Sequence, residues 1–92
     1  MEESKMMKIA RQAIVDYYND RLDKSDSQIM NYNDTYIVWF SKTLQNWKAL
    51  VSTTLPDSMY YEITYNGDKD EIYLDAYKKW ENIVIKNITK EK

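Results

Sequence analysis

The sequence contains no histidine and no cysteine, and it has one glycine and one proline in 92 residues. Without imidazole and thiol groups, the chain offers no histidine general base, no cysteine nucleophile, no disulfide bond and no zinc site of the usual kind. Its one glycine, Gly67, cannot supply a Walker loop or a dinucleotide fingerprint, because both need several glycines where the backbone approaches phosphate. These absences exclude several classes of enzyme.

The remaining composition is that of a small folded domain. Hydrophobic residues make up 43% and charged residues 30% of a chain whose length fits one domain. The net charge is −2 and is evenly spread: residues 1–46 carry seven acidic and six basic side chains, and residues 47–92 carry eight and seven. Because no basic segment stands out, nucleic acid is not the expected partner.

The hydrophobic residues do not form a membrane segment. No apolar run approaches the ~18 residues that a membrane-spanning helix needs. The N-terminal residues Met-Glu-Glu-Ser-Lys lack the basic start and apolar stretch of a signal peptide. We therefore expect a cytoplasmic protein with no membrane partner.

One helix and three strands follow from the periodicity of the first two thirds of the chain. Met6, Ala10 and Ile14 recur every four residues and predict an amphipathic helix over about residues 4–22. Turn-forming residues from Asp23 to Ser27 follow it, and Ile29 or Met30 is expected to tuck under the loop. Runs rich in β-branched and aromatic residues then predict strands at about 35–42, 47–54 and 59–65.

A second helix is predicted over about residues 69–88. Asn66-Gly67 ends the third strand, and Asp68 with Glu71 has the spacing of a capping box. Apolar residues then recur at helical spacing, namely Tyr73, Ala76, Tyr77, Trp80, Ile83, Val84 and Ile88. The expected fold is therefore a single α+β domain in the order α-β-β-β-α, a three-stranded antiparallel sheet with two helices on one face.

The acidic residues do not complete a catalytic or metal-binding pattern. A calcium loop with Gly67 at its sixth position would have Tyr73 at the twelfth, where the bidentate glutamate belongs. A nuclease pattern starting at Pro56-Asp57 would need a lysine where Thr64 stands. We therefore expect no catalytic residues, no metal and no cofactor, and hence a protein that is not an enzyme.

The abundance of aromatic residues is the most unusual positive feature. The chain has nine tyrosines, three tryptophans and one phenylalanine. Large rings bury much area, so several are assigned to the core: Tyr17, Phe40, Tyr61, Tyr77 and Trp80. In the third strand, however, alternation that turns Tyr61 toward the helices turns Tyr60 and Glu62 away from them.

Applied to all three strands, this alternation predicts an exposed patch on the sheet face away from the helices. In the first strand, Ile37 and Trp39 are expected to lie opposite Val38 and Phe40. The patch combines an aromatic and apolar centre with a charged rim and consists of Trp39, Lys48, Leu50, Tyr60 and Glu62. Such a surface is typical of protein-binding sites. A homodimer contact and a stacking surface for single-stranded nucleic acid remain alternatives.

The chain also resembles small uncharacterised accessory proteins from temperate phages and prophages of low-GC Gram-positive bacteria. The resemblance runs from about Val38 to Asn82 and, more loosely, through the first helix. It is carried by the segments 41–46, 48–50, 52–54, 60–62, 64–69 and 73–82. It implies a phage-encoded protein made in the infected cell and supplies no catalytic residues.

Together, the patch and the resemblance predict a binding protein that modulates or inhibits a host or defence-system protein. An inhibitor of a CRISPR nuclease is the most concrete version. The alternative is a nucleic-acid-binding accessory protein of phage replication or transcription, with Trp39 and Tyr60 stacking on unpaired bases.

Overall fold

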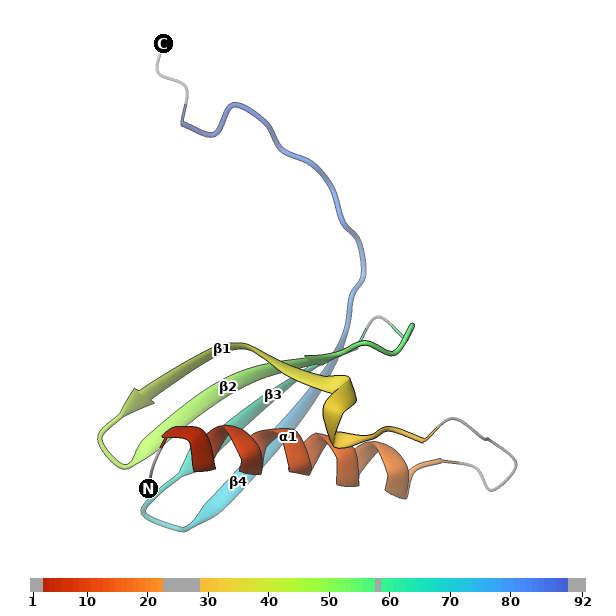
Figure 1. Cartoon of the computed structure of the whole chain (residues 1–92). Coiled ribbons are helices and arrows are strands. Elements are labelled where there is room, and N and C mark those ends of the chain that lie inside the picture. Colours follow the sequence, from red (N-terminus) through yellow and green to blue (C-terminus); the bar gives the residue numbers. More distant parts are fainter. Residues whose placement is uncertain (1–2, 23–28, 58, 90–92) are drawn as a thin grey trace.

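The computed structural model describes residues 3–22, 29–57 and 59–89. In these residues it contains an α-helix, α1 (Glu3–Asp20), and one turn of 3-10 helix, η1 (Tyr32–Asp34). The four strands are β1 (Thr35–Thr43), β2 (Asn46–Thr53), β3 (Met59–Asn66) and β4 (Glu71–Lys78). They form one antiparallel sheet in the order β1-β2-β3-β4 (Figure 1). The single α+β domain with an antiparallel sheet is confirmed, but the sheet has four strands rather than three.

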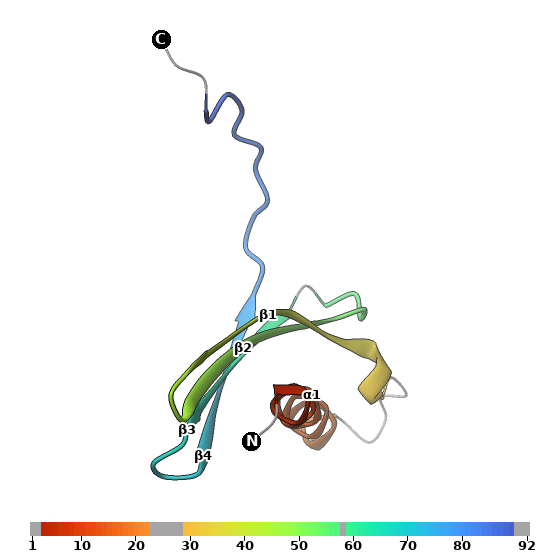
Figure 2. The same ribbon diagram turned by 60° about the vertical axis from the view of Figure 1, so that its left-hand side comes forward.

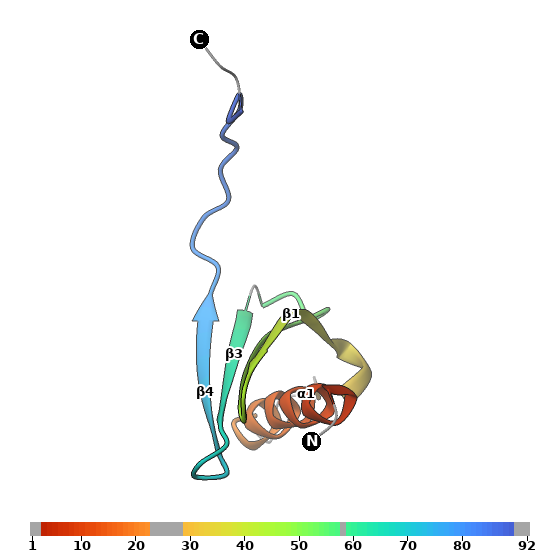
Figure 3. The same ribbon diagram turned by 90° about the vertical axis from the view of Figure 1, so that its left-hand side faces the viewer.

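The helix packs on one side of the sheet, which we call the inner face; the opposite side is the outer face. Met6, Ala10 and Ile14 lie one helical turn apart and are fully buried. They pack against the buried inner-face side chains of β2 and β3, which are Trp47, Ala49, Val51, Tyr61 and Ile63. Figures 2 and 3 show α1 lying against the β1–β2 half of the sheet, with β4 at the far edge.

The segment after the helix is held by polar contacts. Asn19 accepts a hydrogen bond from the Met30 backbone N–H at 2.9 Å and donates one to the Met30 carbonyl at 2.9 Å. Of the two residues expected under the loop, Met30 is buried in the core, while Ile29 is exposed. The expected turn from Asp23 to Ser27 lies outside the described residues.

The structure describes all of residues 69–88, and the second helix predicted for this range is absent from it. Residues 67–70 form a turn, and β4 pairs with β3 from Met59↔Lys78 to Asn66↔Glu71. Asp68 therefore caps no helix, and residues 79–87 are irregular. Tyr77 and Trp80, expected in the core, are 51% and 96% exposed.

The reason for this error is that a spacing of four fits two structures. Tyr73 and Tyr77 share one side of a helix, but they also share one face of a strand. Pairing with β3 satisfies the backbone of β4, and it places Leu74 opposite the buried Ile63. The aromatic and β-branched residues of this segment also favour a strand.

A bulge in β1 decides which of its side chains face outward. The pairing of β1 with β2 shifts between Ile37 and Trp39, so that Ile37 lies opposite Val51 and Trp39 lies opposite Leu50. Val51 is on the inner face and Leu50 on the outer face, so Ile37 and Trp39 are on opposite faces. The expectation that they share a face is wrong, although Trp39 does point outward. The extra residue at Val38 reverses the alternation within the strand.

The single glycine lies where two hairpin turns meet. The Gly67 backbone N–H donates a hydrogen bond to Asn46 Oδ1 at 2.8 Å. A Cβ atom at Gly67 would collide with the Gln45 carbonyl oxygen. Close approach, rather than an unusual backbone angle, therefore requires glycine, and the contact fixes the β3–β4 turn against the β1–β2 turn.

Candidate partner-binding face

The outer face is formed by rows of side chains that run across all four strands. Residues paired across an antiparallel sheet share a face, so the rows follow from the strand register. The three central rows are Tyr36-Ser52-Tyr60-Tyr77, Trp39-Leu50-Glu62-Asp75 and Ser41-Lys48-Thr64-Tyr73. Among the described residues, no helix or strand lies over this face (Figure 3).

All five residues of the predicted patch lie on this face. Trp39 is 41% exposed, while Leu50 and Tyr60 are half-buried beside it. Lys48 Nζ lies 3.4 Å from Glu62 Oε1. The two charged residues belong to the central rows, so they divide the patch instead of forming its rim. The structure therefore brings the five side chains together in an arrangement different from the expected one.

The Lys48–Glu62 ion pair matters more for charge than for stability. The Lys48 side chain is 47% exposed, so water screens the interaction and it contributes at most about 1 kcal/mol. Each charge has its counterion on the same face, however. A partner that covers Lys48 and Glu62 therefore meets a neutral pair, whereas Asp75, opposite Glu62 on β4, is a further acidic residue in the same row.

Three exposed tyrosines on the outer face were not found from the sequence. Tyr36, Tyr73 and Tyr77 extend the patch along β1 and β4, and each is about half exposed. Tyr73 and Tyr77 were missed because their segment was assigned to a helix. The alternation of Tyr73, Asp75 and Tyr77 was the available signal, since period two places all three on one face of a strand.

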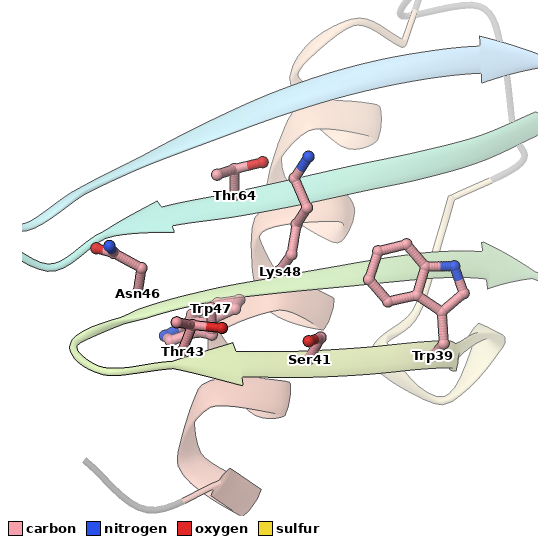
Figure 4. A pocket seen from close by; sticks show the side chains of 7 residues that line it. All are labelled: Trp39, Ser41, Thr43, Asn46, Trp47, Lys48 and Thr64. Atoms are coloured by element: carbon pink, nitrogen blue, oxygen red, sulfur yellow. The ribbon is translucent and has the colours of Figure 1, made fainter.

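Two shallow hollows lie at opposite ends of this face. One has a volume of about 380 Å³, and its lining includes Trp39, Ser41 and Lys48 (Figure 4). In Figure 4 the sheet is seen from the outer side, with the Trp39 indole over the strands and α1 behind them. The other hollow has a volume of about 360 Å³ and is lined in part by Tyr60 and Lys79. Both are open depressions in an aromatic surface.

The inner face, in contrast, is mostly used for the core. The Trp47 ring stacks on Tyr65 at a centroid distance of 5.4 Å and lies 5.7 Å from Phe40. The Tyr65 hydroxyl donates a hydrogen bond to Asp70 at 2.7 Å, and this bond raises the pKa of Tyr65. Burial, and to a smaller extent Asp57, raises the pKa of Tyr61 to about 12. Both tyrosines are therefore neutral hydroxyl groups at ordinary pH and serve the packing.

The described residues offer few groups for chemistry. No cluster of three or more Asp or Glu side chains that could hold a metal ion occurs in residues 3–22, 29–57 and 59–89. Within the same residues, α1 is too polar to span a membrane, and no other helix reaches the required length. The aromatic outer face is accordingly the strongest candidate for a functional site.

Comparison with known proteins finds a matching family. The model of a family described as a family of unknown function (DUF6275) matches residues 7–87. No curated protein and no solved structure matches the chain.

Proposed function

The chain belongs to the family of unknown function DUF6275, and from the geometry of its sheet we propose that it is a non-enzymatic protein that binds another protein through the outer face. The observation that carries this proposal is the set of aromatic side chains on that face. They come from β1, β3 and β4 and comprise Tyr36, Trp39, Tyr60, Tyr73 and Tyr77.

The residue types on this face suit protein recognition. Tyrosine and tryptophan bury a large area with few rotatable bonds, and they are enriched among the residues that dominate binding energy. Trp39 and Leu50 provide an apolar contact beside the 380 Å³ hollow, into which a partner side chain could insert. The tyrosine hydroxyl groups and the Lys48–Glu62 pair provide polar contacts around it.

The charges on the face favour a protein over a nucleic acid. Two basic residues, Lys48 and Lys79, share it with three acidic residues, Glu62, Glu71 and Asp75. Lys48 is already paired with Glu62. A surface without net positive charge gains little from releasing the counterions of a phosphate backbone. Stacking of bases on Trp39 and Tyr60 would therefore lack its usual electrostatic support.

The identity of the partner rests on the resemblance to phage proteins. In this proposal the protein acts in the cytoplasm of an infected bacterium, where it modulates or inhibits a host or defence-system protein. A CRISPR nuclease is the most concrete target. Inhibition by such a protein needs no chemistry of its own, because covering a working surface of the target is sufficient.

A capture experiment from bacterial lysate tests the proposal. Immobilised wild type is compared with Trp39→Ala and Tyr60→Ala, and with Ile29→Ala as a control that removes an exposed apolar side chain outside the sheet. We expect wild type and Ile29→Ala to capture the same protein. Each outer-face variant should reduce capture at least about tenfold, since truncating an aromatic residue that dominates an interface costs about 2 kcal/mol or more.

Two results would contradict this function. Equal capture by all four proteins would place the binding surface elsewhere. Capture of nucleic acid alone, with an affinity for single strands that falls steeply as salt rises, would favour the accessory role in replication or transcription.

A further inference from the structure

The residues after β4 form a segment that we call the C-terminal arm, residues 79–89. It leaves the end of β4 and extends away from the domain (Figures 1 and 3). Its large apolar side chains are all highly exposed: Trp80, Ile83, Val84, Ile85 and Ile88. Water-exposed apolar surface of this extent in one segment indicates that another surface covers it.

The adjacent strand offers an open edge. In the described residues β4 pairs with β3 alone, and this pairing runs through eight residues without a shift. The other edge strand, β1, carries a bulge, which is a common protection of a sheet edge against further pairing. The regular edge of β4 has no such interruption, so its free N–H and C=O groups can accept another strand.

We propose that a second copy of the chain covers both features. The two arms cross on a twofold axis at Trp80, and each arm runs antiparallel along β4 of the partner subunit. The edge and the arm then belong to one self-complementary surface, as a twofold interface requires. This contact includes Tyr77 at the edge of the outer face but not Trp39 or Tyr60, and it goes beyond the proposed function.

The face alternation of β4 continues into the start of the arm. Lys79 lines the same hollow as Tyr36 and Tyr60, which are outer-face residues. Odd-numbered residues therefore face outward from Glu71 to Lys79, and even-numbered residues face inward. Across a twofold axis perpendicular to the sheet, opposed residues share a face and must both be odd or both even.

In the register centred on Trp80, opposite charges and apolar residues pair near the axis, whereas farther out Asp75 lies opposite the partner's Ile85 and Leu74 opposite the partner's Lys86. Lys79 lies opposite the partner's Glu81, so the symmetric pair forms two charge contacts. Tyr77 lies opposite the partner's Ile83, and Ala76 opposite the partner's Val84. The two copies of Trp80 meet at the axis, where aromatic side chains in opposed positions stabilise a sheet. No residues of like charge oppose each other in this register.

Neighbouring registers are less favourable. A centre at Asp75, Lys78, Lys79 or Glu81 would oppose two identical charges, and a centre at Ala76 would oppose Glu71 and Glu81. A centre at Leu74 would oppose Lys69 and Lys79, and a centre at Tyr77 avoids like charges, but both leave Ile85 beyond the end of β4. A centre at Asn82 would oppose Lys78 and Lys86, and centres farther along the arm leave most of β4 unpaired. Trp80 is the centre that covers both the arm and the edge.

Each arm presents on the order of 600 Å² of apolar side-chain surface, since a large aromatic side chain alone contributes ~150–250 Å². Pairing along β4 of the partner subunit covers the backbone edges and the flanks of these side chains, because side chains of a strand point to the two faces of the sheet. The sheet would continue from one copy into the other, with both outer faces on the same side.

A charge-reversal series tests the register. Sedimentation equilibrium of the full chain should show wild type as a dimer. Lys79→Glu and Glu81→Lys each place two pairs of like charges across the axis, so each should raise the dimer Kd about tenfold or more. The double variant restores opposite charges and should restore the Kd. A monomeric wild type, or single variants that dimerise as well as wild type, would overturn the proposal.

Cross-linking gives an independent test, because the chain contains no cysteine. Opposed residues of an antiparallel pair have Cα atoms ~4.5–5.5 Å apart, within the range that a disulfide spans. Under mild oxidation Trp80→Cys should form a covalent dimer rapidly. Ile83→Cys is the control. Residue 83 lies opposite the partner's Tyr77, so the two introduced cysteines do not face each other and should not form a disulfide. Equal cross-linking of both variants, or of neither, would contradict an axis at Trp80.

Discussion

Tyr61 is a buried residue whose ionisation is linked to folding. Its ring packs between α1 and the sheet and meets Tyr17 edge-on at a centroid distance of 6.0 Å. Burial and Asp57 both disfavour the phenolate, which raises the pKa from 10.0 to about 12. The folded chain therefore holds this proton more tightly than the unfolded chain.

The raised pKa predicts a loss of stability at high pH. The contribution of protonated Tyr61 to the free energy of unfolding is fully present below the unfolded pKa of 10.0. It declines as the pH rises toward the folded pKa of about 12. A difference of two pKa units corresponds to a loss of at most about 3 kcal/mol. Denaturant unfolding across this pH range measures the effect. As the pH rises, Tyr61→Phe, which cannot ionise at this position, should lose less of its free energy of unfolding than wild type. Equal losses in both proteins would show that Tyr61 is not linked to folding.

One polar side chain of α1 adds hydrogen bonds to the apolar packing of the helix on the sheet. Arg11 donates hydrogen bonds to Thr35 Oγ1 at 2.8 Å, to the Thr35 carbonyl at 2.9 Å and to the Tyr32 carbonyl at 3.2 Å. Its guanidinium group also lies 3.9 Å from the centre of the Tyr32 ring. One residue thus joins the helix to η1 and to the first residue of β1.

Loss of these contacts should weaken the whole domain. Arg11→Met keeps an unbranched side chain but removes every hydrogen bond, so we expect a loss of about 2 kcal/mol in the free energy of unfolding. Gln12→Met is the matched control, because Gln12 is exposed and its side chain donates a hydrogen bond to Asp16 on the same helix. Urea unfolding of both variants measures the difference. If Arg11→Met cost no more than Gln12→Met, the anchoring role would be wrong.

The elements also show what sequence periodicity can and cannot determine. The predicted strands at 35–42, 47–54 and 59–65 agree with β1, β2 and β3 to within one residue at each end. In β3, alternation identified the buried Tyr61 and Ile63 because one face of that strand is more deeply buried than the other. In β4 both faces are largely exposed, so no contrast between buried and polar positions separated a strand from a helix. Pairing with β3, a tertiary interaction, decided the outcome.

For the whole molecule, the candidate site was only partly visible in the sequence. Alternation placed Lys48, Leu50, Tyr60 and Glu62 outward. Trp39 also points outward, but the bulge that turns it away from Ile37 could not be read from a continuous apolar run. The tyrosines of β4 join the face only once the strand order is known. The structure therefore enlarges the predicted patch and adds a separate apolar arm.

The outer face and the arm give the molecule two surfaces with different expected partners. The arm fits a second copy of the chain, and the outer face fits another protein. In the proposed dimer the arms lie along the strand edges, so both outer faces stay free for binding. Substitution of Trp39 should consequently leave dimerisation unchanged.

The three tryptophans allow these surfaces to be observed separately. Trp39 is on the outer face, Trp47 is buried in the core, and Trp80 is on the arm. In a ¹⁵N-labelled chain each indole N–H gives its own NMR signal. The most direct test of outer-face binding is to add the captured protein and follow these signals. Binding through the outer face predicts that the Trp39 signal changes while those of Trp47 and Trp80 do not. An unchanged Trp39 signal with a bound partner would contradict it.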